Sequence, residues 1–152
     1  MNIVLLEPEI PHNTGAIGRT CYVTGAVLHL IHPLGFFIND KTLRRSGMDY
    51  WNELDVRHYD DFADFLDKNP AANLYFIETF GDKIYSDIQY QKNDYLIFGS
   101  ESKGIARDLI ERHGTAVKIP MIENSRSLNL SVSVGIVLYE ALRQTGWEKF
   151  YA

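Results

Sequence analysis

Five short apolar runs recur along this chain, and most of the intervals between them are long enough to hold a helix. The runs are almost continuously hydrophobic, without the strict alternation of a strand that has one face in water. They occupy residues 3–6, 27–31, 74–77, 95–98 and 116–119. Runs of this kind are typical of strands buried on both faces. The pattern therefore predicts an α/β fold with a parallel sheet that is covered by helices on both sides.

Helical patterns lie between or after these runs. They span residues 14–24, 61–68, 105–113 and about 128–145. Asp60 is placed to cap the second of these helices, and Gly114 and Gly146 are placed to end the third and the fourth. No repeat, low-complexity tract or linker divides the chain. We therefore expect one domain over residues 1–152, although the pattern does not give the strand order.

The cysteine content and the apolar segments narrow the cellular setting. Cys21 is the sole cysteine, and no Cys/His cluster has zinc spacing, so we expect neither a disulfide nor a bound metal. The first apolar run is too short for a signal peptide, and residues 20–39 are too interrupted by Gly, Pro and His for a membrane span. These features favour a reducing, cytoplasmic location.

The charge balance limits how the chain can bind a nucleic acid. The formal net charge of −5 argues against binding through phosphate neutralisation over the whole surface, so any contact with RNA has to be local. A candidate patch is Lys41, Arg44 and Arg45, to which Arg57 and His58 can be added. The charge pattern alone is equally consistent with a solvated helix face.

Two polar segments join a predicted strand to a predicted helix, where α/β proteins bind ligands. In the segment 7–20, Asn13 can cap the helix, Gly15 permits close backbone approach, and Arg19 can reach a phosphate or a developing negative charge. In the segment 98–105, Gly99 and Gly104 frame a turn that carries Glu101. Gly99 and Gly104 have the glycine spacing of a P-loop, but Ile105 and Ala106 stand where a P-loop requires Lys and Ser or Thr. Neither segment has the spacing of a dinucleotide fingerprint. The alternative reading of each segment is an ordinary helix start.

The segment 119–131 is the most specific of the three. It runs from a predicted strand through hydroxyl, amide and guanidinium side chains into the last helix. Ser127 and Asn129 can both cap that helix, but a helix needs only one cap. The surplus of polar groups indicates a site.

Taken in order, the three segments resemble the three signature motifs of the SPOUT superfamily of knotted RNA methyltransferases. The matching residues are Asn13, Gly15 and Arg19, then Gly99, Glu101 and Gly104, then Ser127, Leu128, Asn129 and Leu130. The match covers essentially the whole chain. Within the superfamily the chain resembles small 2′-O-methyltransferases that modify the wobble nucleotide of leucine tRNAs, also through residues 7–11 and 43–50. The resemblance implies a parallel sheet with helices on both faces and a C-terminal trefoil knot, an exception to unknotted chains.

The resemblance also implies a cofactor, S-adenosylmethionine, and a set of site residues. It assigns the cofactor to a set of residues within and beside the second and third motifs: Ile77, Glu78, Gly99, Gly104, Ile119, Met121 and Ser127. Arg19 is expected to stabilise charge on the reacting ribose oxygen, because a guanidinium stays protonated and is a poor base. Asn13, Glu101, Ser127 and Asn129 are expected to complete the catalytic set, with His12 as an alternative base.

The expected partners are a second copy of the chain and the anticodon stem-loop of a tRNA. Such enzymes form homodimers through the first and last helices, and Lys41, Arg44 and Arg45 are expected to contact the RNA. Three alternatives stay open. They are a catalytically silent RNA-binding module, a methyltransferase of another tRNA or rRNA position, and an NAD-dependent dehydrogenase, although the last lacks its glycine fingerprint.

Overall fold

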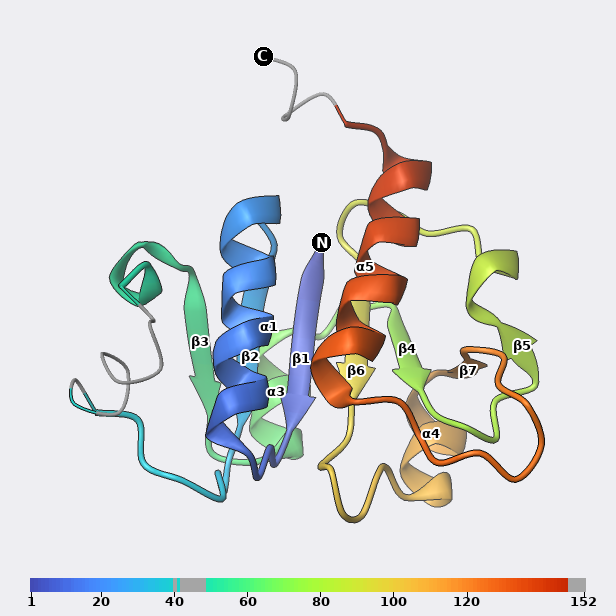
Figure 1. The fold of residues 1–152 in the computed structure, drawn as a ribbon, viewed down its shortest axis with the longest axis horizontal. Coiled ribbons are helices and arrows are strands. Elements are labelled where there is room, and N and C mark those ends of the chain that lie inside the picture. Colours follow the sequence, from blue (N-terminus) through green and yellow to red (C-terminus); the bar gives the residue numbers. More distant parts are fainter. Residues whose placement is uncertain (40, 42–48, 148–152) are drawn as a thin grey trace.

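A computed structural model describes residues 1–39, 41 and 49–147 of the chain. Within this part, parallel strands form one sheet in the order β3-β2-β1-β6-β4-β7-β5 (Figure 1). The strands are β1 (Asn2–Leu6), β2 (Val27–Ile31), β3 (Val56–Tyr59), β4 (Leu74–Ile77), β5 (Lys83–Ile84), β6 (Tyr95–Phe98) and β7 (Thr115–Lys118). The predicted parallel sheet is thus confirmed.

Helices cover both faces of this sheet, as predicted (Figure 1). The helices are α1 (Pro11–Thr24), α3 (Phe62–Lys68), α4 (Arg107–His113) and α5 (Leu130–Thr145), with short 3-10 turns η1 (Trp51–Glu53) and η2 (Tyr85–Asp87). Helices α1 and α5 pack together on one face, and α3 and α4 lie on the other. None of the helices in the described ranges is long and apolar enough to cross a membrane.

Alternate residues of each central strand face the two helical layers. In β1, Ile3 and Leu5 belong to the core beneath α1 and α5, while Val4 belongs to the core beneath α3 and α4. Both faces are dry at these three positions, so all three side chains are apolar. This explains why the central strands appear in the sequence as unbroken hydrophobic runs.

The two strands that the sequence reading missed lie at the edges of the sheet. Strand β3 carries Arg57 and His58, which are exposed, so its pattern does not stand out as a buried strand. Strand β5 is only two residues long. Both owe their assignment to pairing with a neighbour, β2 and β7 respectively, and such pairing leaves little trace in a local pattern.

Two predicted helix caps were wrong. Helix α1 begins at Pro11, so Asn13 lies inside its first turn and does not cap it. Pro is favoured at this position because its missing N–H has no partner in the first turn anyway. Asp61, and not Asp60, caps α3, by accepting a hydrogen bond from the backbone of Asp64 at 2.8 Å.

The parallel order brings the three polar segments to one edge of the sheet. The strands β1, β6, β4 and β7 are consecutive neighbours, and their carboxyl ends all point to the same edge (Figure 1). The segments that follow β1, β6 and β7 are those singled out in the sequence, and residues 78–82 follow β4. The trefoil knot stays a prediction from the resemblance.

Candidate functional site

A cavity of about 630 Å³ opens at this edge of the sheet, a size typical of small-molecule sites. Its lining includes all the residues assigned from the resemblance to the cofactor, and all the expected catalytic residues except Arg19. These lining residues are Asn13, Ile77, Glu78, Gly99, Glu101, Gly104, Ile119, Met121, Ser127 and Asn129. The geometry therefore brings together side chains and backbone from four separate segments of the chain.

The turn after β6 closes on itself through its two glycines. The backbone N–H of Gly104 donates to the carbonyl of Ser100 at 2.9 Å, and Gly104 has a φ of +64°, which favours glycine. A Cβ on Gly99 would overlap the carbonyl group of Gly104. The expected place of Gly99 in the cofactor site therefore does not by itself explain why a glycine is needed here. The first group to need this space is the backbone of the turn itself.

Glu101 ties this turn to the start of α1. Its Oε2 accepts from the backbone N–H of Glu9 at 2.8 Å, and its Oε1 accepts from the N–H of Ile10 at 3.2 Å and from Nδ2 of Asn13 at 3.1 Å. Both carboxylate oxygens are therefore occupied by donors. This arrangement suits a group that holds two segments in place better than one that takes up a proton.

Asn13 and Asn129 continue this connection to the third segment. Nδ2 of Asn129 donates to Oδ1 of Asn13 at 3.0 Å, while Oδ1 of Asn129 accepts from the backbone of Ser131 at 2.9 Å and thereby caps α5. Asn13 is 5% exposed. One chain of hydrogen bonds, from Glu101 through Asn13 to Asn129, thus links all three polar segments.

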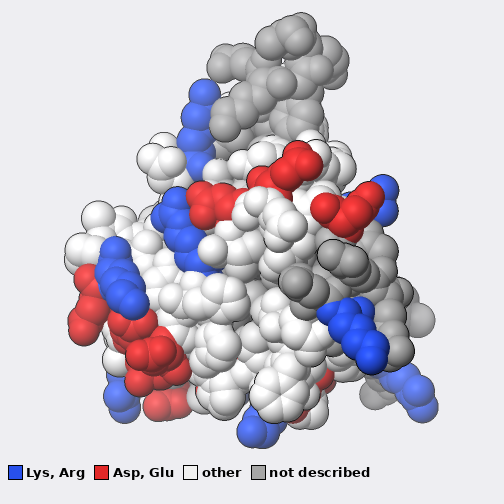
Figure 2. Space-filling view, turned by 90° about the vertical axis from the view of Figure 1, so that its left-hand side faces the viewer, with Lys and Arg blue, Asp and Glu red and all other residues white. Residues whose placement is uncertain are grey.

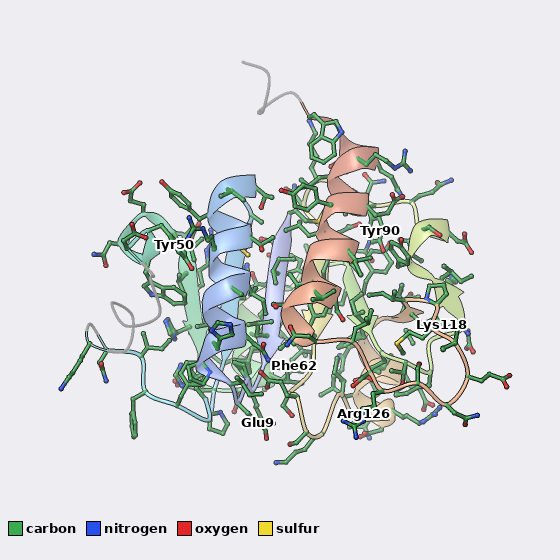
Figure 3. The ribbon with its side chains drawn as sticks, viewed as in Figure 1. Glu9, Tyr50, Phe62, Tyr90, Lys118 and Arg126 are labelled. Atoms are coloured by element: carbon green, nitrogen blue, oxygen red, sulfur yellow. The ribbon has the colours of Figure 1, made fainter. Side chains whose placement is uncertain are left out.

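Glu9 is a site residue that the sequence reading did not single out (Figure 3). Its carboxylate accepts from the backbone N–H of Ser102 at 2.9 Å and from the Ser102 hydroxyl at 2.7 Å. The hydrogen bonds from Ser102 hold the pKa of Glu9 below its usual range. Glu9 and Glu101 therefore each accept backbone N–H groups of the other's segment. The nearest sequence signal was the Glu-Pro-Glu stretch at 7–9, which gave no indication of the partner.

Glu78 places a half-buried carboxylate inside the cavity. Its backbone N–H donates to the Val117 carbonyl at 2.9 Å, and its Oε1 accepts from the N–H of Ile105 at 2.5 Å. Burial raises the pKa of Glu78, against the hydrogen bonds from backbone amides, which lower it. A carboxylate in this position favours a cationic group on a ligand.

Arg19 does not line the cavity to which its own α1 contributes Asn13. Arg19 lies six positions after Asn13, which places it about 9 Å further along the helix and about 240° around it. The side chain of Arg19 is exposed, and its guanidinium carbon lies 5.8 Å from the centre of the Tyr50 ring. His12, the alternative base, is also exposed and is absent from the residues that line this cavity.

The predicted RNA-binding patch is described only in part. Lys41 is exposed, whereas Arg44 and Arg45 lie outside the described residues. Arg57 forms an ion pair with Asp55 at 2.9 Å, so its charge is locally balanced. On the face that carries β3, basic and acidic side chains lie interspersed among the described residues (Figure 2). Arg57 is therefore weakly supported as a further RNA-binding residue beside Lys41, Arg44 and Arg45.

His58 forms a pair with His32 at the same carboxyl edge. Its Nδ1 lies 2.9 Å from Nε2 of His32, and the two rings are 5.2 Å apart. Burial, reinforced by the neighbouring His32, lowers the pKa of His58. A histidine that favours its neutral form adds little to phosphate binding, so the suggested extension to His58 also has weak support.

The parallel sheet and the cavity at its carboxyl edge define an open α/β protein whose cavity is lined by the three polar segments and the residues that follow β4. The characteristic pattern of the SpoU rRNA Methylase family matches residues 1–139. The chain belongs to this family.

Relatives with known names and structures agree with this assignment. A protein of Yersinia pestis named tRNA (cytidine(34)-2′-O)-methyltransferase is 46% identical, covering 97% of this chain and 95% of its own. A solved structure described as giving insights into the 2-OH methylation of C/U34 on tRNA is 42% identical, with a TM-score of 0.88 and 94% of each chain covered. An rRNA methyltransferase of Sinorhizobium meliloti, solved with AdoMet bound, is 26% identical, with a TM-score of 0.82 over 93% of this chain and 55% of its own.

Proposed function

We propose that this protein is an S-adenosylmethionine-dependent methyltransferase that modifies the 2′-hydroxyl of the wobble nucleotide, position 34, of tRNA. The observation that carries the proposal is the hydrogen-bonded chain from Glu101 through Asn13 to Asn129, which joins the three motif segments around one cavity. The tRNA (cytidine(34)-2′-O)-methyltransferase of Yersinia pestis matches this chain over nearly its full length, which supports the same reaction here.

The lining of the cavity fits S-adenosylmethionine. Ile77 and Ile119 offer apolar surface to the adenine, the turn that joins Gly99 to Gly104 offers backbone groups, and Glu78 offers a carboxylate to a cationic centre. When bound, this cofactor supplies a methyl group on a sulfonium, which is transferred by in-line displacement. Ser127 and Met121 lie on the opposite segment and would complete its enclosure.

The residues of the chain supply positioning and charge stabilisation for the attacking ribose. The 2′-hydroxyl has to lie behind the methyl group and lose its proton as the new bond forms. The Arg19 guanidinium is positively charged and stabilises the negative charge that develops on this oxygen. Its remaining N–H groups are available to a neighbouring phosphate. Asn13, Glu101 and Asn129 hold the segments in place, and Ser127 orients the ribose.

A homodimer would bring Arg19 to a cavity. Because Arg19 is exposed and does not line the cavity of its own chain, we infer that a second copy delivers it. Helices α1 and α5 carry exposed apolar side chains that suit such an interface: Tyr22, Val23, Val132 and Tyr139. Water-exposed apolar groups of this kind are stabilised when a partner covers them.

Within tRNA, the proposed substrate is the anticodon stem-loop of the leucine isoacceptors. Lys41, with Arg44 and Arg45 outside the described residues, would contact its phosphates. Replacing both arginines with alanine should weaken RNA binding and flatten its salt dependence. Unchanged RNA affinity at every salt concentration would remove this patch from the interface.

The decisive experiment combines labelled S-adenosylmethionine with total tRNA and maps the methylated nucleotide. We expect methylation at position 34 and none on a tRNA with deoxyribose at that nucleotide only. Arg19→Ala should lose methyl transfer on saturating tRNA while its affinity for the cofactor stays near that of the wild type. Arg19→Lys should rescue poorly, since a point charge does not reproduce the planar fork of the guanidinium.

The alternatives that act on RNA have their own outcomes in this experiment. Methylation of the deoxyribose substrate would mean that a base or another ribose is the target. Binding of tRNA without methyl transfer to any of its nucleotides would indicate a silent RNA-binding module. Wild-type turnover by Arg19→Ala would remove the role given to that residue.

A further inference from the structure

The side of α1 that carries Arg19 is covered by the segment that begins at Tyr50. Tyr50 is 7% exposed and lies alongside the helix (Figure 3), and its hydroxyl donates to the backbone carbonyl of Gly15 at 2.5 Å. Trp51 fills the space over Gly18, where a Cβ would lie 2.8 Å from the indole ring. The absence of side chains at Gly15 and Gly18 lets this segment reach the backbone of the helix.

The Tyr50 hydroxyl binds the turn of α1 from which Arg19 projects. In an α-helix the carbonyl of residue 15 accepts from the N–H of residue 19, so the hydroxyl joins the hydrogen bond that places Arg19. Burial raises the pKa of Tyr50, whereas the charge of Arg19 and its backbone N–H both lower it. Arg19 therefore acts on the Tyr50 phenol through both its charge and its backbone N–H.

The Tyr50 ring also faces the Arg19 side chain. The guanidinium carbon lies 5.8 Å from the ring centre, within the distance of a cation–π contact. The ring stacks on Tyr22 at 5.4 Å, and the Tyr22 hydroxyl in turn donates to Glu53 at 3.0 Å. Among the ion pairs of the described residues, none involves Arg19. Within that part of the chain, Tyr50 is thus the group placed to restrain the guanidinium.

We propose that Tyr50 is the positioning residue for Arg19, with its hydroxyl fixed to the Arg19 turn of the helix and its ring holding the guanidinium in the orientation required at the ribose oxygen. This inference rests on the proposed function, since it takes Arg19 as the catalytic group. An exposed arginine samples many rotamers, and restraining them before the reaction lowers the barrier to the productive geometry.

The test compares two substitutions of Tyr50 in two backgrounds. Tyr50→Leu, which removes the ring, should lower kcat on saturating tRNA about tenfold to a hundredfold, without changing the Kd for S-adenosylmethionine. Tyr50→Phe, which keeps the ring and loses the hydroxyl, should retain most of kcat. On the residual rate that Arg19→Ala retains at high enzyme concentration, Tyr50→Leu should cause no further loss, because the group that Tyr50 positions is already gone.

Two results would overturn the proposal. One is a folded Tyr50→Leu protein with the wild-type kcat. The other is an equal loss from Tyr50→Leu with and without Arg19, which would mean that Tyr50 supports the fold in general.

A second measurement needs neither a folded Leu variant nor methyl transfer. In the wild-type protein, NMR relaxation should show the Nε–H of Arg19 to be more ordered than that of Arg112 on α4, whose 73% exposed side chain is held, within the described part of the chain, only by a 3.7 Å ion pair with the exposed Asp108. The order of Arg19 should persist in Tyr50→Phe. Equal order of the two arginines would contradict the proposal. If the wild type methylates no tRNA, the proposed function fails, while this measurement still decides whether Tyr50 holds Arg19.

Discussion

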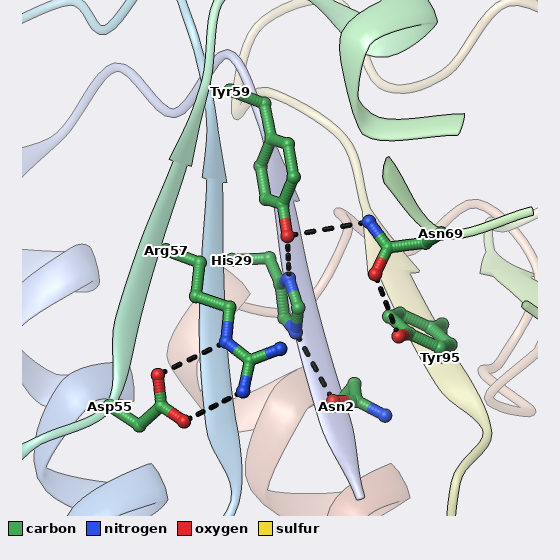
Figure 4. Close-up of polar contacts among 7 residues, drawn as sticks. All are labelled: Asn2, His29, Asp55, Arg57, Tyr59, Asn69 and Tyr95. Carbon is green, nitrogen blue, oxygen red and sulfur yellow. Dashed lines mark hydrogen bonds and ion pairs between the residues drawn. The ribbon is translucent and has the colours of Figure 1, made fainter. Parts of the chain in front are cut away.

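His29 lies within β2 with its ring fully buried, and its neighbours determine which nitrogen carries the proton (Figure 4). The amide nitrogen of Asn2 donates to the backbone carbonyls of residues 93 and 94, so its Oδ1 faces Nε2 of His29 at 3.2 Å. Because that oxygen only accepts, Nε2 carries the proton. Nδ1 then accepts from the hydroxyl of Tyr59 at 2.8 Å. A neutral ring with its proton on Nε2 satisfies both of these contacts.

This neutral ring predicts a loss of stability in mild acid. Burial, and secondarily the charge of Arg57, lowers the pKa of His29 to about 4. Between pH 6.5 and pH 4 the unfolded chain takes up a proton that the folded protein does not, so the free energy of unfolding falls with the pH, by up to about 3 kcal/mol. Above pH 6.5 this contribution is constant. Urea denaturation at a series of pH values measures it.

His29→Gln is the matched variant for this test. Glutamine can donate and accept in the same place but does not titrate. The variant should be less stable at pH 7, with a shallower decrease in stability between pH 6.5 and pH 4.5. The same slope in both proteins would assign the acid sensitivity to the carboxylates.

Gly99 gives a second prediction for a single residue. Gly99→Val should abolish binding of S-adenosylmethionine, because its side chain overlaps the Gly104 backbone and opens the turn that lines the cavity. Calorimetric titration with the cofactor measures the loss. Ala106→Val, at an exposed position after the same turn, should bind normally. Wild-type affinity in a folded Gly99→Val protein would show that the turn lies outside the binding site.

At the scale of elements, the N-terminus of α5 serves both the helix and the site. Oδ1 of Asn129 caps the helix, and Nδ2 holds Asn13 on α1. Helices α1 and α5 also pack directly on one another. The Asn129 side chain therefore links the position of the start of α5 to that of the start of α1.

Substitutions at Asn129 should separate these two tasks. Asn129→Ala removes the cap and should cost about 1 kcal/mol of unfolding free energy. Asn129→Asp keeps an acceptor for the Ser131 N–H but places a carboxylate against the Asn13 oxygen, so it should keep most of the stability and lose methyl transfer. Thermal unfolding and a tRNA methylation assay report the two effects. Equal activity of Asn129→Asp and the wild type would mean that only the cap matters.

At the scale of the molecule, the site is divided between surfaces that one copy does not bring together. The cavity lies at the carboxyl edge of the sheet, while Arg19 projects from α1 away from it. A complete site under the proposed function therefore requires a dimer. Its mass in sedimentation should be twice 17.4 kDa.

Mixed dimers test this division directly. Arg19→Ala has an intact cavity, and Gly99→Val has an intact Arg19, so each alone should be inactive. Mixing the two with subunit exchange should restore about a quarter of the wild-type activity, because half of the dimers then contain one complete site. The tRNA methylation assay measures the recovery. No recovery in mixtures shown to exchange subunits would mean that Arg19 acts on its own cavity or not at all.

The sequence by itself determined the buried strands and the polar segments of the site. A strand that is dry on both faces is mostly apolar, so β2, β4 and β6 were predicted with the bounds that the structure has, although β2 contains the buried His29. Caps such as Asn129 also act over one turn of the chain. These features depend on local interactions, and a local pattern is enough to reveal them.

Only the tertiary structure decided what those polar groups bind. Asn13 reads as a helix cap in the sequence, but its partners Glu101 and Asn129 lie 88 and 116 positions away. Gly99 is required by the backbone of its own turn, and Arg19 faces Tyr50 and not the cavity. Such contacts depend on the order of strands in the sheet and on the rotation of each helix about its axis. Both are set by packing over the whole chain, so no local pattern encodes them.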